Sequence, residues 1–197
     1  MRRGLIFIGI AVCLLRADGF EIRGKVTSAW QKNSFTIETR SEETSLWLEP
    51  PQNGRLLAQV ATAGAEMNKY RFKFTEPITL KGMKEWQITV LWDSTDGNWR
   101  CRLGRGEEPV LKRVQGYADT TFNFTWMLVT EEDVERWRFA SPKEATFIVR
   151  CSSPGRRGVE EQDLADSPKL EIFGPGVFKI EVEPIDGGGE FVGERIK

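Results

Sequence analysis

The sequence predicts an all-β protein, an antiparallel β-sandwich with one or two short helical turns. Apolar residues alternate with polar residues in seven separate runs, and this period of two is typical of half-buried strands. Clusters of Gly, Pro, Asn and Asp separate the runs and indicate tight turns. Strands with polar outer faces and turns at this density favour antiparallel sheets, arranged as a sandwich or a barrel.

Each predicted strand has one apolar face. In the third run, Trp86, Ile88 and Val90 share a face with Trp92, and the residues between them point the other way. The seven runs lie at residues 34–38, 70–75, 86–92, 99–103, 122–128, 147–151 and 178–183.

The polar segment inside residues 91–101, LWDSTDGNWRC, joins the third and fourth runs. It has some features of a calcium loop, but an EF-hand loop needs Gly at its sixth position and Glu at its twelfth. Counted from Asp93, those positions hold Asn and Gly. Asp-Gly is instead a preferred turn pair, so we expect a hairpin with Trp92, Trp99 and Cys101 facing the core.

Helix signals are few. Residues 130–137 begin with Thr130 as a candidate N-cap and carry acidic residues in the first turn, which predicts one short helix. Residues 158–167 form either a second helical turn or a loop. Residues 186–197 are expected to be a flexible tail with one weak strand. The sequence shows no internal repeat.

Residues 1–19 have the pattern of a secretory signal peptide. Two arginines precede an apolar run at residues 5–15, which is too short to span a bilayer but suits the apolar region of a signal. Ala17 and Gly19 are the small residues that a signal peptidase needs, and they place the cut after Gly19. We therefore expect a secreted protein, extracellular or periplasmic. The alternative readings are an N-terminal membrane anchor or a buried strand.

Cleavage would leave residues 20–197, which suit a single β-sandwich domain with its own core. Their formal charge is about −3, and charges of both signs alternate along the chain. Nucleic acid binding requires a positive surface, so this class of partner is rejected. No later apolar run is long enough to span a membrane.

Cys101 and Cys151 remain after loss of the signal segment. In an oxidising compartment an even pair of cysteines usually forms a disulfide, and we expect one between these two residues. If both face inward, the bond joins the two sheets as in an immunoglobulin domain, although the Trp and Tyr positions typical of that family are missing. The alternative is two separate buried thiols.

Residues 70–104, YRFKFTEPITLKGMKEWQITVLWDSTDGNWRCRLG, resemble a segment of galactose-binding-like jelly rolls and carbohydrate-binding modules. The resemblance covers about a fifth of the chain and implies a jelly-roll-like sandwich of eight or nine strands. It also implies that a glycan or a protein binds on a sheet face or a loop edge, without assigning binding residues. Residues 24–39 resemble the first hairpin of a five-stranded OB barrel.

The residue inventory argues against catalysis. The chain has no His, which removes the usual general base and the commonest zinc ligand. A disulfide would occupy both remaining cysteines, and no Ser lies in a nucleophile-elbow motif. We therefore expect no catalytic residues, no cofactor and no tightly bound metal. A pair of carboxylates could still hydrolyse glycosides, but nothing distinguishes two of the many acidic residues.

Seven Trp residues are many for this length. Trp can fill a core or stack on a sugar ring. Four of them share apolar faces and are predicted to be core: Trp86, Trp92, Trp99 and Trp126. Trp30, Trp47 and Trp137 break that pattern and are the candidate ligand-binding residues. Asn123 begins a sequon that would be an N-glycosylation site in a eukaryotic host.

The function predicted from these observations is that of a secreted, non-catalytic binding module. Carbohydrate is the expected ligand class. The alternative is a secreted protein-binding effector or decoy, or a structural protein of a cell surface.

Overall fold

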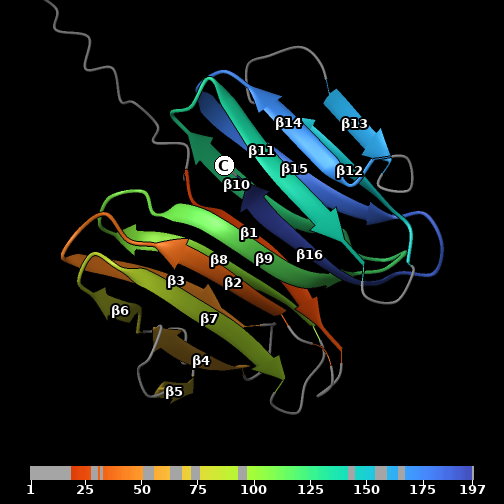
Figure 1. The fold of residues 1–197 in the computed structure, drawn as a ribbon. Helices are drawn as coiled ribbons and strands as arrows, with labels where there is room; N and C mark the ends of the chain where they lie inside the picture. Colours follow the sequence, from red (N-terminus) through yellow and green to blue (C-terminus); the bar gives the residue numbers. More distant parts are fainter. Residues whose placement is uncertain are drawn as a thin grey trace, which may run out of the picture.

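The computed structural model describes residues 19–27, 31, 33–50, 56–62, 68–71, 76–92, 97–141, 145–153, 159–163 and 167–196. Within these ranges the chain forms sixteen β-strands and no helix (Figure 1). The predicted signal peptide, except for Gly19, lies outside the described residues.

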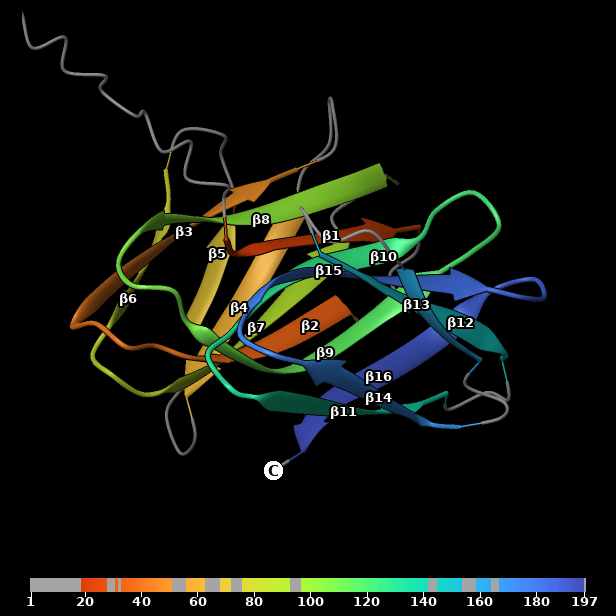
Figure 2. The same ribbon diagram turned by 90° about the horizontal axis from the view of Figure 1, so that it is seen from above.

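The strands form two antiparallel sheets of eight strands each. Sheet A has the order β13 (Val159–Asp163), β12 (Phe147–Ser152), β15 (Gly176–Pro184), β10 (Phe124–Thr130), β1 (Glu21–Val26), β8 (Gly97–Arg105), β3 (Glu43–Glu49) and β6 (Ile78–Lys81). Sheet B has the order β14 (Lys169–Phe173), β11 (Val134–Ala140), β16 (Gly189–Ile196), β9 (Val110–Ala118), β2 (Asn33–Glu38), β7 (Glu85–Trp92), β4 (Leu56–Thr62) and β5 (Asn68–Arg71). The sheets stack face to face (Figure 2), which confirms the predicted antiparallel sandwich.

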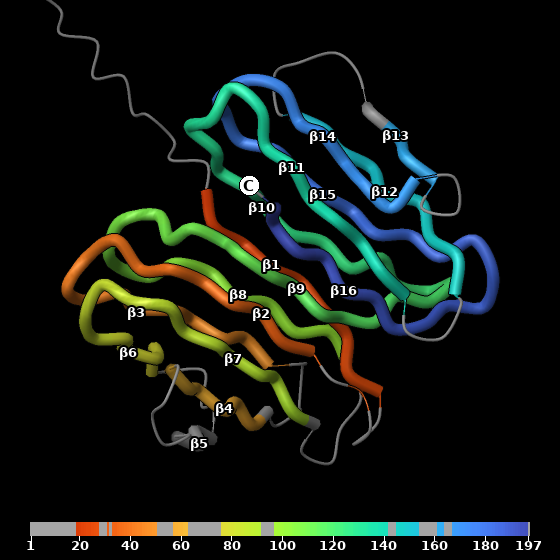
Figure 3. Tube along the Cα trace, in the orientation of Figure 1, coloured from red at the N-terminus to blue at the C-terminus, as the bar shows by residue number. Residues whose placement is uncertain are grey.

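The predicted hairpin around residues 91–101 is wrong. The strands that it joins, β7 and β8, lie in different sheets, so this segment connects the two layers. The hairpin implied by the resemblance of residues 24–39 to an OB barrel is wrong for the same reason, because β1 lies in sheet A and β2 in sheet B. Figure 3 traces β1, β2, β7 and β8, the strands on either side of these connections.

The predicted helix at residues 130–137 is also wrong. Thr130 ends β10 and Val134 begins β11. The Thr130 hydroxyl accepts a hydrogen bond from the Glu132 backbone N–H at 3.1 Å, so the residue that looked like a helix cap closes a tight turn instead. Within residues 158–167, the part at 159–163 is strand β13.

Residues 189–196 form β16, which lies between β11 and β9 inside sheet B. The strand predicted within residues 186–197 is therefore present, but the prediction of a flexible tail is wrong for this segment. Its inward positions include Gly189, Phe191, Gly193 and Arg195, so only one of them is a large apolar residue. Gly193 is small because a Cβ there would lie 2.9 Å from the Phe139 ring.

The molecule contains an internal duplication. Strands β1–β8 form an N-terminal half, with the order β1-β8-β3-β6 in sheet A and β2-β7-β4-β5 in sheet B. Strands β9–β16 form a C-terminal half with the corresponding orders β9-β16-β11-β14 and β10-β15-β12-β13. The counterpart of β1-β8-β3-β6, which lies in sheet A, lies in sheet B, and the counterpart of β2-β7-β4-β5, which lies in sheet B, lies in sheet A. This is the strand order of a jelly roll, so two small jelly rolls join edge to edge.

The register of the strands follows the same duplication. Ile22 lies opposite Trp126, and its counterpart Val114 lies opposite Phe35. Equivalent positions are 91 or 92 residues apart throughout both halves: Ile22 and Val114, Gly24 and Gly116, Ile88 and Ile180, Trp99 and Phe191, Phe35 and Trp126. The prediction of no internal repeat is therefore wrong. The repeat is hard to see in the sequence because the halves share positions and packing roles but few identical residues.

Two strand pairs join the halves, β1 with β10 in sheet A and β2 with β9 in sheet B. One hydrophobic core runs between the sheets across this junction. Its centre is a series of aromatic contacts in which Phe124 packs edge-on against Trp99 at 6.1 Å and against Phe191 at 5.1 Å between ring centroids. Trp99 and Trp126 are buried, which confirms the prediction for both.

Cys101 and Cys151 do not form the predicted disulfide. Both face the core from sheet A, in one row that runs from Cys101 through Ile22, Trp126 and Ile180 to Cys151. Four strand spacings separate them, about 19 Å, whereas a disulfide needs Cα atoms about 4.4–6.8 Å apart. The prediction assumed that inward-facing cysteines belong to opposite sheets. Burial raises the pKa of the Cys101 thiol and keeps it protonated.

Candidate functional site

The three Trp residues proposed as ligand contacts have different environments. Trp137 is fully buried, and its indole N–H donates a hydrogen bond to Glu135 Oε1 at 3.1 Å. The prediction that Trp137 is exposed for a ligand is therefore wrong. Trp30 lies outside the described residues. Trp47 is partly exposed on the outer face of sheet A.

The sequence of β3 explains the position of Trp47. Its neighbours Leu46 and Leu48 are buried in the core, so the alternation of the strand turns Trp47 outward. The indole packs on the neighbouring strand β8 at Gly104, where a Cβ would lie only 2.5 Å from Cδ1 and Nε1 of the ring. The missing side chain lets the ring lie against the sheet, beside Arg102 on the same strand.

A ladder of ion pairs continues from Arg102 over the same face. Arg102 pairs with Glu49, and Arg100 Nη1 lies 3.9 Å from the second oxygen of Glu49. Arg100 also binds Glu21, with its Nε 2.8 Å from Oε2, and Arg23 pairs with Glu21 as well. Each charged group therefore has an opposite partner, which fixes the side chains on the surface.

Glu21 occupies the centre of this ladder. Burial raises the pKa of its carboxyl group, but the hydrogen bonds from Arg100 and Arg23 have the larger combined effect. The pKa of Glu21 is therefore lowered from its ordinary value, and the carboxylate is ionised at neutral pH.

A depression of about 350 Å³ lies next to Glu21 on the same face. Polar and flexible side chains line it, including Arg23, Asn123, Thr125, Met127, Lys179 and Glu181. The Asn123 amide donates a hydrogen bond to Glu181 Oε1 at 2.7 Å, and Lys179 Nζ lies 2.9 Å from Oε2. Burial raises the pKa of Glu181, but the two hydrogen bonds together lower it by a larger amount. The net pKa is therefore below the ordinary value.

Trp47 and the depression belong to one continuous surface. Trp47, Arg102 and Glu21 follow one another across β3, β8 and β1, and Glu21 also lines the depression together with Lys179 of β15. The path from β3 to β15 crosses four strand spacings, about 19 Å. We refer to the surface made by Trp47, Arg102, Glu21 and the depression as the A-face.

The charged groups of the A-face are paired with one another. Its carboxylates are held by arginine, lysine or asparagine, and the described pKa shifts there lower the pKa instead of raising it toward neutrality. No cluster of three or more potential metal ligands occurs among the described residues. The A-face offers one aromatic ring, several oriented donors and acceptors, and an open hollow.

Sequence reasoning found Trp47 but missed the rest of the A-face. The sequence does show charged residues at the polar positions of these strands. Only the register shows that charges of opposite sign lie opposite each other. Without the strand order, Glu21, Arg100 and Glu49 could not be placed together. Asn123, noted only for its sequon, lines the depression.

No protein-family model matches the sequence, and no curated protein matches it. The resemblance of residues 70–104 to carbohydrate-binding jelly rolls is supported as far as a β-sandwich. Among the described residues there is no helix long and apolar enough to cross a membrane.

Proposed function

We propose that this protein is a secreted, non-catalytic module that binds carbohydrate on the A-face. The observation that carries the proposal is the partly exposed Trp47, packed on Gly104 and followed by a row of fixed charged side chains. An aromatic ring can stack on the apolar face of a sugar ring, and oriented charged groups can bind its hydroxyls.

The length of the A-face fits an extended ligand. At about 19 Å it is longer than a single sugar ring, so several rings of one chain could lie along it. Trp47 provides the stacking contact at one end, and Asn123, Lys179 and Glu181 provide hydrogen bonds at the other. Because Glu181 already pairs with Lys179 and accepts a hydrogen bond from Asn123, these three side chains lose little entropy on binding.

A titration with neutral hexasaccharides tests this proposal. We expect cellohexaose, xylohexaose, mannohexaose or laminarihexaose to bind, and Trp47→Ala to weaken that binding by about 1–3 kcal/mol, the scale known for aromatic stacking on bases. The melting temperature should stay within a few degrees. Trp47→Phe is the matched control, since it keeps an aromatic ring and should retain most of the affinity.

The alternative, a protein-binding effector or decoy, predicts a different result. None of the hexasaccharides would bind, and Trp47→Ala would leave the saccharide titration unchanged. If Trp47→Ala instead lowers the melting temperature as much as Trp99→Ala, Trp47 is a packing residue and the A-face is not the site.

A further inference from the structure

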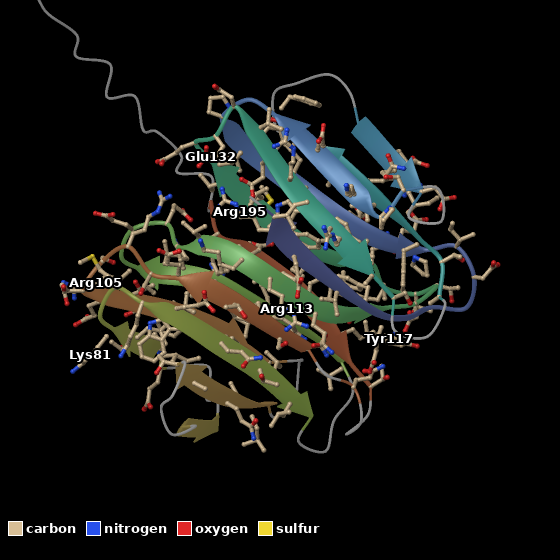
Figure 4. The ribbon with its side chains drawn as sticks, viewed as in Figure 1. Lys81, Arg105, Arg113, Tyr117, Glu132 and Arg195 are labelled. Atoms are coloured by element: carbon tan, nitrogen blue, oxygen red, sulfur yellow. The ribbon has the colours of Figure 1, made fainter. Side chains whose placement is uncertain are left out.

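A second hollow lies on the outer face of sheet B. It is a groove of about 410 Å³ that crosses β4, β7, β2, β9 and β16, and we refer to it as the B-face groove. Figure 4 labels Arg113, one of its lining residues, on this side of the molecule. The groove thus lies on the opposite side of the sandwich from Trp47.

The internal duplication relates this groove to the A-face depression. Thr36, Gln87 and Arg113 line the groove, and their counterparts 91 or 92 positions away are Met127, Lys179 and Glu21. All three counterparts line the depression on sheet A. The two hollows therefore overlap at these three equivalent positions of the duplicated fold, one hollow beside each junction between the halves.

The charges along the groove are balanced. Lys112 Nζ lies 2.6 Å from Glu38, and Arg113 Nε lies 3.1 Å from Glu194. Arg195 also lines the groove, but its side chain points inward from β16, where Nη2 lies 2.6 Å from the buried carboxylate of Glu135. Because each lining cation has a carboxylate partner, the groove has no excess positive charge to attract an anion.

The remaining groups suit a neutral ligand with many hydroxyls. Thr36 and Thr62 supply hydroxyl groups, Gln87 supplies an amide that both donates and accepts, and Glu85 supplies acceptors. The ion pairs hold Arg113 and Glu194 in place as further hydrogen-bonding groups. None of the described lining residues is aromatic, so a ligand here would be held by hydrogen bonds without stacking.

We propose that the B-face groove is a second site for neutral saccharide, related through the duplication to the depression on sheet A. The protein would then bind two saccharide chains on opposite faces. This inference rests on the proposed carbohydrate-binding function, but it makes a separate claim about sheet B.

The test is an NMR titration of the ¹⁵N-labelled full chain with the same four hexasaccharides. We expect at least one of the four hexasaccharides to shift two sets of NMR signals. One set is the Trp47 indole on sheet A, and the other is the backbone and side-chain amides of Gln87 on sheet B. Gln87→Ala should weaken binding at the B-face groove about fivefold, as for loss of one or two neutral hydrogen bonds, and leave the A-face affinity unchanged. Gln59→Ala is the matched control, because Gln59 points outward from β4 but does not line the groove.

The outcomes separate this inference from the proposed function. Shifts on sheet A alone overturn the second site and leave the A-face proposal standing. Shifts on sheet B alone, sensitive to Gln87→Ala, support the second site and contradict the role of Trp47. If none of the four probes shifts either group, both proposals fail.

Discussion

The N-terminal and C-terminal halves have the same strand order but differently built interiors. Where the N-terminal half has Trp99, the C-terminal half has Phe191, and where the C-terminal half has Trp126, the N-terminal half has Phe35. Gly occupies the same position in both, at Gly24 and Gly116. A Cβ at Gly24 would lie 2.4 Å from the Trp99 ring, and one at Gly116 would lie 2.3 Å from the Phe124 ring. Both halves therefore keep the same strand register and the same close packing at Gly, although the aromatic residues at equivalent positions differ.

The halves also differ in polarity at one pair of inward-facing positions. In the N-terminal half Thr44 and Leu103 occupy them, while the C-terminal half has Glu135 and Arg195. Glu135 is 1% exposed and accepts hydrogen bonds from Arg195, Thr130 and Trp137. A buried carboxylate with three donors is stable only as a complete group, so the C-terminal half depends on an ion pair that the N-terminal half does not need.

The largest effect should come from truncating equivalent aromatic residues. Trp99→Ala and Phe191→Ala should each cost about 3–5 kcal/mol of unfolding free energy, because both side chains are buried in the same aromatic series. Urea unfolding measures both. A cost below about 1 kcal/mol at either position would mean that the two halves do not share their core.

Breaking the ion pair should distinguish the halves. Glu135→Leu leaves Arg195 without its carboxylate and should cost about 3 kcal/mol, whereas Thr44→Val at the equivalent position should cost much less. Replacing both partners, as Glu135→Leu with Arg195→Leu, should recover most of the loss. Equal costs for Glu135→Leu and Thr44→Val in urea unfolding would refute the asymmetry.

Exchanging aromatic residues between equivalent positions should have a small effect. No described residue accepts a hydrogen bond from the indole N–H of Trp99 or Trp126, and each buried unpaired donor carries a cost. Trp99→Phe and Trp126→Phe remove that donor and keep an aromatic ring but leave a small cavity, so each should cost about 1–2 kcal/mol, much less than truncation to Ala. A loss as large as that of Trp99→Ala, measured by thermal unfolding, would contradict this view.

Acid should weaken both the ion-pair ladder and the depression on sheet A. The pKa values of Glu21 and Glu181 are lowered in the folded state, relative to about 4.3 for an unfolded Glu. Their stabilising effect is therefore complete above about pH 4.3 and is lost as pH falls through their folded pKa values. Urea midpoints at pH 7, 4 and 3 should fall at the two acid points, and Glu21→Gln should reduce that fall. An equal fall in the variant would show that the Glu21 pairs contribute nothing.

The sequence predicts the sandwich and most of the strands with clean alternation, such as β7, β10, β12 and β15. It fails where alternation is interrupted by a packing requirement. In β9, the register shifts so that Arg113 and Leu111 pair with consecutive residues of β2, which leaves Lys112 as an extra residue and hides the period of two. In β16, Gly193 and Arg195 point inward, so the strand has too few apolar residues to be recognised.

The candidate site was predictable only in part for a similar reason. The turn of Trp47 away from Leu46 and Leu48 is visible in the sequence. Trp137 has a polar neighbourhood in the sequence, but that neighbourhood includes Glu135, which is buried beside it as its hydrogen-bond acceptor. Sequence alone does not distinguish a polar residue that faces solvent from one that completes a buried network.

The central claim is that two equivalent strand pairs join the duplicated halves, and cysteine cross-linking tests it most directly. Arg23 lies opposite Thr125 at one junction, and their counterparts Gln115 and Ser34 lie opposite each other at the second. Directly opposed residues have Cα atoms about 4.5–5.5 Å apart, within the range for a disulfide. Oxidised variants with Arg23→Cys and Thr125→Cys, or with Ser34→Cys and Gln115→Cys, should therefore each form the designed bond, as identified by peptide mass spectrometry. The offset pair Arg23→Cys and Met127→Cys should not. Absence of both designed bonds, or equal bonding of the offset pair, would contradict the duplicated architecture.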